Sequence, residues 1–196
     1  MAGVPRLLRV HGVSNGTRKR IQTEQQRMEN VLIIGCGRHG RIVAETISLA
    51  GKFTVCGFAD DDPAKLGTRL DGIPVLGPWR QSAAQNCFVA IGHNETRRRI
   101  CAEVVRAGRH LLTVISPAAY VSAHATLGAG TVVLAGAVIQ AGATLGTGVL
   151  VNAGAAVDHD TTVGDFVHLG LNSTVESFAQ VASGEWLAPG SVRGKA

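Results

Sequence analysis

The second half of the chain repeats with a period of six residues. From residue 113 to residue 196, the third place of the repeat is aliphatic in thirteen of fourteen cases. Neither an α-helix, with 3.6 residues per turn, nor a strand, with a period of two, has this rhythm. It predicts a left-handed parallel β-helix, in which each hexapeptide forms one flat side and its aliphatic side chain points inward. The thirteen residues are Ile115, Val121, Leu127, Val133, Ile139, Leu145, Val151, Val157, Val163, Leu169, Val175, Val181 and Leu187.

A membrane span is the rival interpretation of this half, because residues 110–157 contain no Asp, Glu, Lys or Arg. The sixth place, however, is glycine in five successive repeats, at Gly130, Gly136, Gly142, Gly148 and Gly154. A transmembrane helix requires a continuous apolar segment and does not produce a six-residue period. We therefore expect a solenoid and no membrane partner.

The first half has a different pattern, in which short buried strands alternate with helices. Aliphatic runs at 31–34 and 87–91 and a mixed run at 53–59 read as strands, and 73–76 as a short third strand or edge. Alternation of strands and helices predicts an α/β unit with a parallel sheet. We expect a Rossmann-like domain over 31–112 and the β-helix over 113–196.

A glycine motif follows the first predicted strand. Gly35-x-Gly37-x-x-Gly40 opens a helix, and Asp60 lies twenty residues beyond Gly40, which fits a nucleotide-binding fingerprint. Residues 31–112 amount to about one mononucleotide unit, whereas a dinucleotide needs two. A nucleotide-linked ligand fits better than NAD; the alternatives are an NAD-dependent oxidoreductase and a tight turn that binds nothing.

The glycine rhythm of the second half breaks at Asp160, within Asp158-His159-Asp160. A histidine beside a carboxylate is typical of a general base whose tautomer and basicity its neighbour sets. His168 follows nine residues later and should face another side of the coil, so the two histidines would converge only between neighbouring subunits. The alternatives are a solvated turn histidine at His159 and a plain turn former at Asn152.

Charge and cysteine content exclude other classes. Residues 1–30 carry six Lys/Arg against two Glu, and the rest of the chain is nearly neutral. We expect a disordered basic extension over 1–30, no secretory signal and no nucleic-acid partner. The four cysteines show no metal-ligand spacing, so we expect no metal and a cytoplasmic protein.

Several motifs together resemble one family. They are the glycine loop with Arg38-His39-Gly40, the acidic turn at 58–63, the segment 90–94, the hexapeptide array, Asn152-Ala153-Gly154, the segment 157–160 and the segment 164–168. These resemble the bacterial sugar acetyltransferases of the sialic acid O-acetyltransferase type, in the hexapeptide-repeat acyltransferase superfamily. That family includes N-acetyltransferases that act on nucleotide-linked 4-amino sugars such as UDP-bacillosamine.

The resemblance implies that residues 31–112 form a nucleotide-sugar-binding domain and residues 113–196 an acetyltransferase domain. It also implies a homotrimer with acetyl-CoA in the groove between neighbouring subunits. It implies His159 as the general base, Asp160 as the residue that polarises it, and Asn152 and His168 as assistants around the amine and the thioester, with His168 on the coenzyme side. Ser177 lies eighteen residues past His159, so its N–H is the candidate donor to the thioester oxygen. Implied substrate-binding residues are Gly35, Gly37, Arg38, His39, Gly40, Asp60, Asp61 and Gly92, together with Asn152.

The implied function is acetyl-CoA-dependent N-acetylation of a nucleotide-linked amino sugar for surface-glycan synthesis, by direct attack with histidine as the base. Two alternatives stay open. One is a sugar O-acetyltransferase. The other is a catalytically impaired nucleotide-sugar-binding scaffold, because the array decays after Leu187 and the chain ends at Ala196, which reads as a shortened β-helix.

Overall fold

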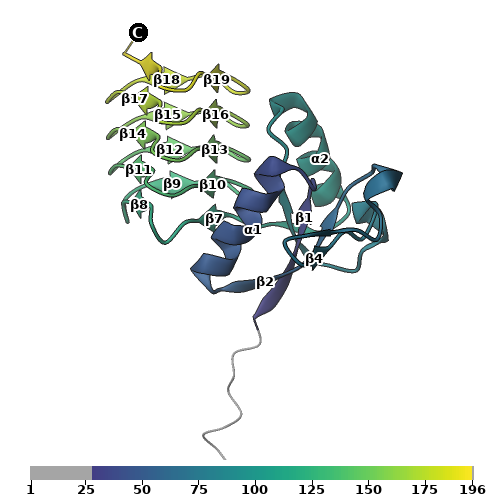
Figure 1. The fold of residues 1–196 in the computed structure, drawn as a ribbon. Helices are drawn as coiled ribbons and strands as arrows, with labels where there is room; N and C mark the ends of the chain where they lie inside the picture. The colour runs from purple at the N-terminus through teal and green to yellow at the C-terminus, as the bar shows by residue number, and fades with distance from the viewer. Residues whose placement is uncertain (1–27, 196) are drawn as a thin grey trace, which may run out of the picture.

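A computed structural model describes residues 28–195 and shows an α/β domain beside a tall stack of coils (Figure 1). The basic extension predicted for 1–30 lies largely outside the described residues. Glu29 and Asn30 already belong to the first strand, β1 (Glu29–Ile34).

The α/β domain is a four-stranded parallel sheet with a helix on each face. Its order is β2-β1-β5-β6, formed by β1, β2 (Phe53–Ala59), β5 (Asn86–Val89) and β6 (His110–Leu111). Val31 and Ile33 of β1 pack with the core under α1 (Arg38–Ala50). Leu32 and Ile34 pack with the core under α2 (Asn94–Arg106). Burial on both faces explains why β1 reads as a continuous aliphatic run.

The segment 73–76, predicted as a short third strand or edge, lies at the edge of the sheet, where Val75 forms a parallel bridge with Phe58 of β2. Its first residues form β4 (Ile73–Pro74), which pairs with β3 (Arg69–Leu70) in a small antiparallel hairpin. Proline has no N–H to give to a central strand, which accounts for this edge position. Short 3₁₀ turns precede and follow the hairpin, η1 (Pro63–Lys65) and η2 (Trp79–Gln81). The two-residue strand β6 was not predicted, because so short a segment carries no periodicity.

The second half forms a left-handed parallel β-helix with two-residue strands on three sides. The docking sheet contains β7, β10, β13, β16 and β19; the second sheet β8, β11, β14, β17 and β20; the third sheet β9, β12, β15 and β18. Residues eighteen apart stack in register, as Val133 does on Val151. The strands are β7 (Val114–Ile115), β8 (Tyr120–Val121), β9 (Thr126–Leu127), β10 (Val132–Val133), β11 (Val138–Ile139), β12 (Thr144–Leu145), β13 (Leu150–Val151), β14 (Ala156–Val157), β15 (Thr162–Val163), β16 (His168–Leu169), β17 (Thr174–Val175), β18 (Gln180–Val181), β19 (Trp186–Leu187) and β20 (Val192–Arg193).

The core of the β-helix contains the third-place residues, as the period predicts. Ten of the thirteen are buried, from Val133 to Leu187. The other three belong to the first coil, where Ile115 is 38% exposed and Val121 and Leu127 are partly buried. They are more exposed because no coil lies beneath the first one.

The outer face of the docking sheet attaches the β-helix to the α/β domain. Val114, Val132 and Leu150 occupy the outward second place of their hexapeptides, yet they are buried in one cluster with Val43 and Ile47 of α1. Figure 1 shows α1 lying along the lower coils and α2 beside the upper ones. Within residues 28–195, none of the helices has the length and apolar content needed to cross a membrane.

Candidate functional site

The glycine loop joins β1 to α1 at the carboxyl edge of the sheet, where parallel α/β sheets bind ligands. A Cβ at Gly35 would come within 2.9 Å of the Ala90 carbonyl oxygen, and one at Gly40 within 2.2 Å of the Gly35 carbonyl oxygen. Both glycines are therefore required by the packing itself. Gly37 borders open space and precedes the helix, so it leaves the backbone N–H groups of the helix start accessible to a phosphate.

Asp60 and Asp61 follow β2 at the same edge, but their environments differ. The Asp60 carboxylate accepts hydrogen bonds from the N–H of Cys36 at 3.0 Å, from the N–H of Asp62 at 3.1 Å and from Lys65 Nζ at 2.8 Å. Burial alone would raise the pKa of Asp60, but these hydrogen bonds outweigh it and hold the pKa below the ordinary value. Asp60 thus fixes the glycine loop, whereas Asp61 is exposed.

Two histidines lie at the junction between the glycine loop and the β-helix, His39 in α1 and His168 in β16. Desolvation, with the charges of His168 and Arg97, lowers the pKa of His39 to about 4. Desolvation and Arg97 also lower the pKa of His168, against the opposing effect of a hydrogen bond with the Gly92 backbone. Both rings are therefore neutral at pH 7. The structure brings His39, Gly92 and His168 together across the domain junction.

Arg97 holds this junction, and the sequence analysis missed its role. Its side chain is fully buried and donates to the carbonyl oxygens of Ile91 and Gly92 in one domain and of Gly148 and Phe166 in the other, at 2.8 to 3.1 Å. A signal existed, since Arg97 lies on the same helical face as Ile100, Cys101 and Val104. A charged residue on an apolar face indicates a buried hydrogen-bonding role.

His159 and Asp160 lie at a corner of the coil, between the second and third sheets, which we call the His159 corner. His159 Nδ1 and Asp160 Oδ2 are 2.9 Å apart, and that hydrogen bond raises the pKa of His159, with help from the charge of Asp158. The ring meets Phe178 edge-to-face, with centroids 5.1 Å apart. A carboxylate, an aromatic edge and solvent therefore surround the imidazole.

Asp160 adopts φ = 55°, the left-handed conformation that glycine supplies in the preceding repeats. Its side chain lies over Gly142 of the coil below, where a Cβ would approach Asp160 Oδ1 to 2.3 Å. Glycine at position 142 therefore leaves room for the Asp160 side chain of the next coil.

The other predicted site residues lie at separate places. Arg38 is exposed at the start of α1. Asn152 follows β13 at the corner between the docking and second sheets, and its Oδ1 accepts from the N–H of Ala153 at 2.9 Å. Ser177 lies at the His159 corner one coil beyond His159, next to Phe178, whose N–H donates to the His159 carbonyl.

One chain does not bring all these residues together. The coil is triangular, and the His159 corner is the vertex opposite the docking sheet, which carries His168 and the α/β domain. A site that used His159 together with the glycine loop would need two copies of the chain.

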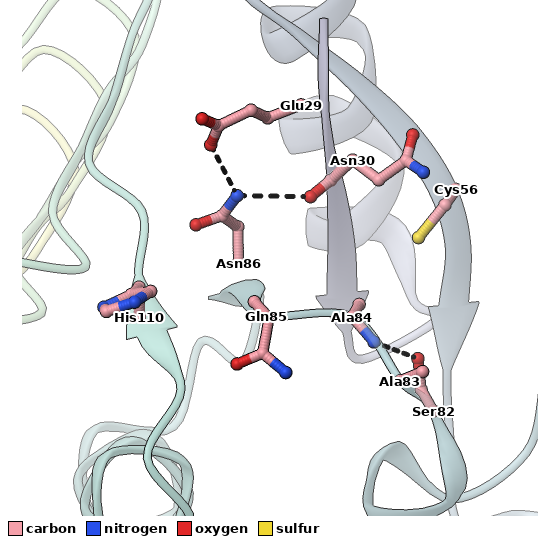
Figure 2. A pocket seen from close by; sticks show the side chains of 9 residues that line it. All are labelled: Glu29, Asn30, Cys56, Ser82, Ala83, Ala84, Gln85, Asn86 and His110. Atoms are coloured by element: carbon pink, nitrogen blue, oxygen red, sulfur yellow. Dashed lines mark hydrogen bonds between the residues drawn. The ribbon is translucent and has the colours of Figure 1, made fainter.

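A different hollow, of about 610 Å³, lies at the amino ends of the sheet strands (Figure 2). Its lining includes Glu29, Asn30, Asn86 and His110. Asn86 Nδ2 donates to Glu29 Oε2 at 2.9 Å and faces the Asn30 carbonyl at 3.4 Å, so these groups satisfy one another. The hollow is on the edge opposite the glycine loop, and we do not assign it to the site.

Comparison with known proteins supports one family. Residues 30–104 match the model of the PglD N-terminal domain. The acetyltransferase domain of PglB from Neisseria gonorrhoeae FA1090 is 33% identical with a TM-score of 0.75, covering 84% of this chain and 90% of that one. The chain belongs to the bacterial sugar N-acetyltransferases of the hexapeptide-repeat type.

Two further members of this acetyltransferase family are similar. Perosamine N-acetyltransferase from Caulobacter crescentus, solved as a variant with CoA and GDP-perosamine, is 33% identical with a TM-score of 0.68, covering 86% of this chain and 84% of that one. UDP-N-acetylbacillosamine N-acetyltransferase from Bacillus subtilis (strain 168) is 30% identical over 121 residues. That match covers 55% of this chain and only 52% of the Bacillus protein, so the chain spans about half the length of that curated relative.

The predicted resemblance and fold class are thus confirmed. At the level of the family, so are the predicted enzyme class, acetyltransferase, and the predicted co-substrate, since the Neisseria domain was also solved with acetyl coenzyme A. The individual site residues stay predictions.

Proposed function

We propose that this protein transfers the acetyl group of acetyl-CoA to the amine of a nucleotide-linked amino sugar. The observation that carries the proposal is that one chain contains two features. One is a glycine loop at the carboxyl edge of a parallel sheet with the size of one mononucleotide-binding unit. The other is the His159–Asp160 pair at a corner of the β-helix. The first element suits a nucleoside diphosphate, and the second suits removal of a proton.

The α/β domain holds the nucleotide part in this proposal. The N–H groups around Gly37 and the start of α1 bind the phosphates, with Arg38 beside them and His39 beneath. Asp61, whose carboxylate is exposed, accepts hydrogen bonds from the base or ribose. Asp60 contributes through the loop that it fixes.

His159 is the general base. A sugar ammonium must lose a proton before its nitrogen can attack the thioester carbon, and a neutral imidazole takes that proton directly or through water. Attack forms the C–N bond and places negative charge on the thioester oxygen, for which the Ser177 N–H is the proposed donor. Collapse breaks the C–S bond and releases CoA, whose thiolate takes up the second proton that the nitrogen loses as the amide forms. Asn152 and His168 orient the amine and the thioester.

We propose a homotrimer that builds each site from two subunits. The position of the His159 corner, opposite the docking sheet, supports this assembly. One subunit provides the glycine loop and His168, its neighbour provides His159 and Asp160, and acetyl-CoA occupies the groove between them.

We place the reaction in the cytoplasm and in surface-glycan synthesis. The four cysteines are unpaired in the structure, as a reducing compartment would keep them. Amino sugars activated by a nucleotide are suited to transfer onto a growing glycan.

Thiol release from acetyl-CoA, measured with UDP-, dTDP- and GDP-linked amino sugars, tests the proposal. We expect turnover with at least one of them, and a kcat lower by roughly 10²–10⁴-fold in His159→Ala, the usual contribution of a positioned base. The Ala variant should fold, because the inward Val157 is unchanged. Binding of a nucleotide sugar without binding of acetyl-CoA would instead establish a scaffold, and turnover only with sugar hydroxyls an O-acetyltransferase.

A further inference from the structure

A cleft of about 440 Å³ opens between the two domains beside His168. Residues 92–95, at the end of the sheet and the start of α2, form one wall, and His168, Gly184 and Trp186 form the other. The cleft therefore joins the carboxyl edge of the nucleotide-binding sheet to the outer face of the docking sheet.

Trp186 is the unusual residue of this cleft. It is 60% exposed, whereas the other tryptophan, Trp79, is 3% exposed. It occupies the outward second place on the docking sheet, where Val132 and Leu150 are covered by the α/β domain. Trp186 is paired in register with His168, so the two residues stand about 4.8 Å apart along the sheet.

The backbone before Trp186 is tied to the nucleotide domain. Asn94 Nδ2 donates to the carbonyl oxygens of Gly184 at 2.9 Å and Glu185 at 3.2 Å, and its Oδ1 accepts from Arg97 at 2.9 Å. Glu185 also forms an ion pair with Arg193. These contacts hold both walls of the cleft, and they fix the backbone just before Trp186 relative to Asn94.

On the basis of the proposed function, we propose that Trp186 is the platform on which the amino-sugar ring of the substrate stacks, and so a specificity-determining residue. A pyranose ring has an apolar C–H face and a polar rim. The cleft has the matching arrangement, with an indole on one wall and polar groups of His93 and Glu95 on the other. Pockets of this composition use apolar surface for affinity and few polar groups for orientation.

Fluorescence tests the platform directly, because Trp79 is buried and Trp186 is exposed. GDP-perosamine or a UDP-linked 4-amino sugar should change the tryptophan emission, whereas GDP or UDP alone should not, because the bare nucleotide ends before the cleft. The change should vanish in Trp186→Phe while the affinity stays within about threefold, since a phenyl ring still stacks.

Kinetics provide the second readout. Trp186→Ala should raise the KM for the sugar nucleotide about tenfold and leave the KM for acetyl-CoA unchanged, and Trp186→Phe should restore most of the loss. Tyr120→Ala is the matched control, because Tyr120 is also a second-place aromatic residue, 56% exposed, on the second sheet. It should behave as the wild type.

The outcomes separate this inference from the proposed function. If the sugar nucleotide binds and is acetylated while Trp186→Ala keeps the wild-type KM, the platform is wrong and the function stands. An equal loss in Tyr120→Ala would overturn the platform by showing a general effect on the fold. If the folded wild type neither binds nor acetylates any sugar nucleotide, both proposals fail.

Discussion

At the scale of the residue, the environment of His159 shifts its pKa in the opposite direction from the environments of His39 and His168. His159 is exposed beside a carboxylate, and its pKa is raised. His39 and His168 are desolvated near Arg97, and the pKa values of both are lowered. A nearby negative charge favours the imidazolium, and burial favours the neutral ring. His159 is therefore suited to take up a proton, and the other two to remain neutral at an interface.

The influence of Asp160 on His159 gives a testable pH dependence. His159 acts as a base only when neutral, so the wild-type kcat should rise with pH through an apparent pKa above the ordinary histidine value of 6.5. Asp160→Asn removes the carboxylate that raises the pKa, so this limb should move to lower pH, and kcat at high pH should fall less than in His159→Ala. A kcat profile from about pH 5 to 9 measures the shift.

Asp71→Asn is the control for that profile. Asp71 is an exposed carboxylate of the α/β domain, where it pairs with Arg41 and lies far from the His159 corner. In Asp71→Asn, the rise of kcat should occur at the same pH as in the wild type. A limb that does not move in Asp160→Asn, or moves to higher pH, would remove Asp160 from the mechanism.

At the scale of the element, each corner of the β-helix depends on the coil below it. From Gly130 to Gly190, the sixth place of the hexapeptide is left-handed whether it is glycine or not, with φ of 74° at Gly142, 55° at Asp160 and 62° at Phe178. Non-glycine residues in this conformation carry strain that the surrounding structure must offset, and they cluster at functional sites. The His159 corner contains two of them in successive coils.

A pair of glycine substitutions separates strain from function. Gly142→Ala and Gly136→Ala should each cost about 1–2 kcal/mol, because both glycines have left-handed φ values of 74° and 71°. Only the Gly142 Cβ would meet Asp160, whereas the nearest atom at Gly136 is 3.8 Å away. We therefore expect kcat to fall about tenfold in Gly142→Ala alone. Urea unfolding and kcat are the measurements; equal kcat values in the two variants would contradict the proposed role of Gly142.

At the scale of the whole molecule, one buried guanidinium connects the two domains. Arg97 satisfies carbonyl oxygens at the end of the nucleotide-binding sheet and in the coil, and burial lowers its pKa to about 10, so it stays charged at pH 7. Its planar fork reaches acceptors in several directions at once. The domains are therefore joined by directional hydrogen bonds as well as by the apolar contact of α1.

Replacing this residue should loosen the whole assembly. Arg97→Lys retains the charge but leaves several buried carbonyl oxygens unpaired, so we expect a loss of about 2–4 kcal/mol in the free energy of unfolding. Arg99→Lys is the control, since Arg99 is exposed and keeps its pair with Glu103 as lysine; it should change stability by less than about 0.5 kcal/mol. A wild-type unfolding midpoint in Arg97→Lys would show that the apolar contact alone holds the domains.

The sequence by itself determined the β-helix, because a period of six dictates which side chain of each hexapeptide points inward. It also determined the glycine loop and the His159–Asp160 pair, since Gly35, Gly40 and Asp160 occupy places that local backbone geometry constrains. These features depend on neighbours that lie close in sequence or exactly one coil away. The cover over the outward aliphatic residues Val132 and Leu150, by contrast, was not predicted and comes from the structure.

Only the tertiary structure decided the features that depend on contacts between the two domains. Arg97 stands on the apolar face of α2, but its acceptors on Gly148 and Phe166 lie far away in the chain and are known only from the fold. Asp60 reads as a ligand-binding carboxylate until Cys36 and Lys65 occupy it. The position of Trp186 beside the nucleotide-binding edge is known only because Asn94 holds the turn before it. Periodicity reports which way a side chain points, whereas hydrogen bonds between distant segments arise only after the chain has folded.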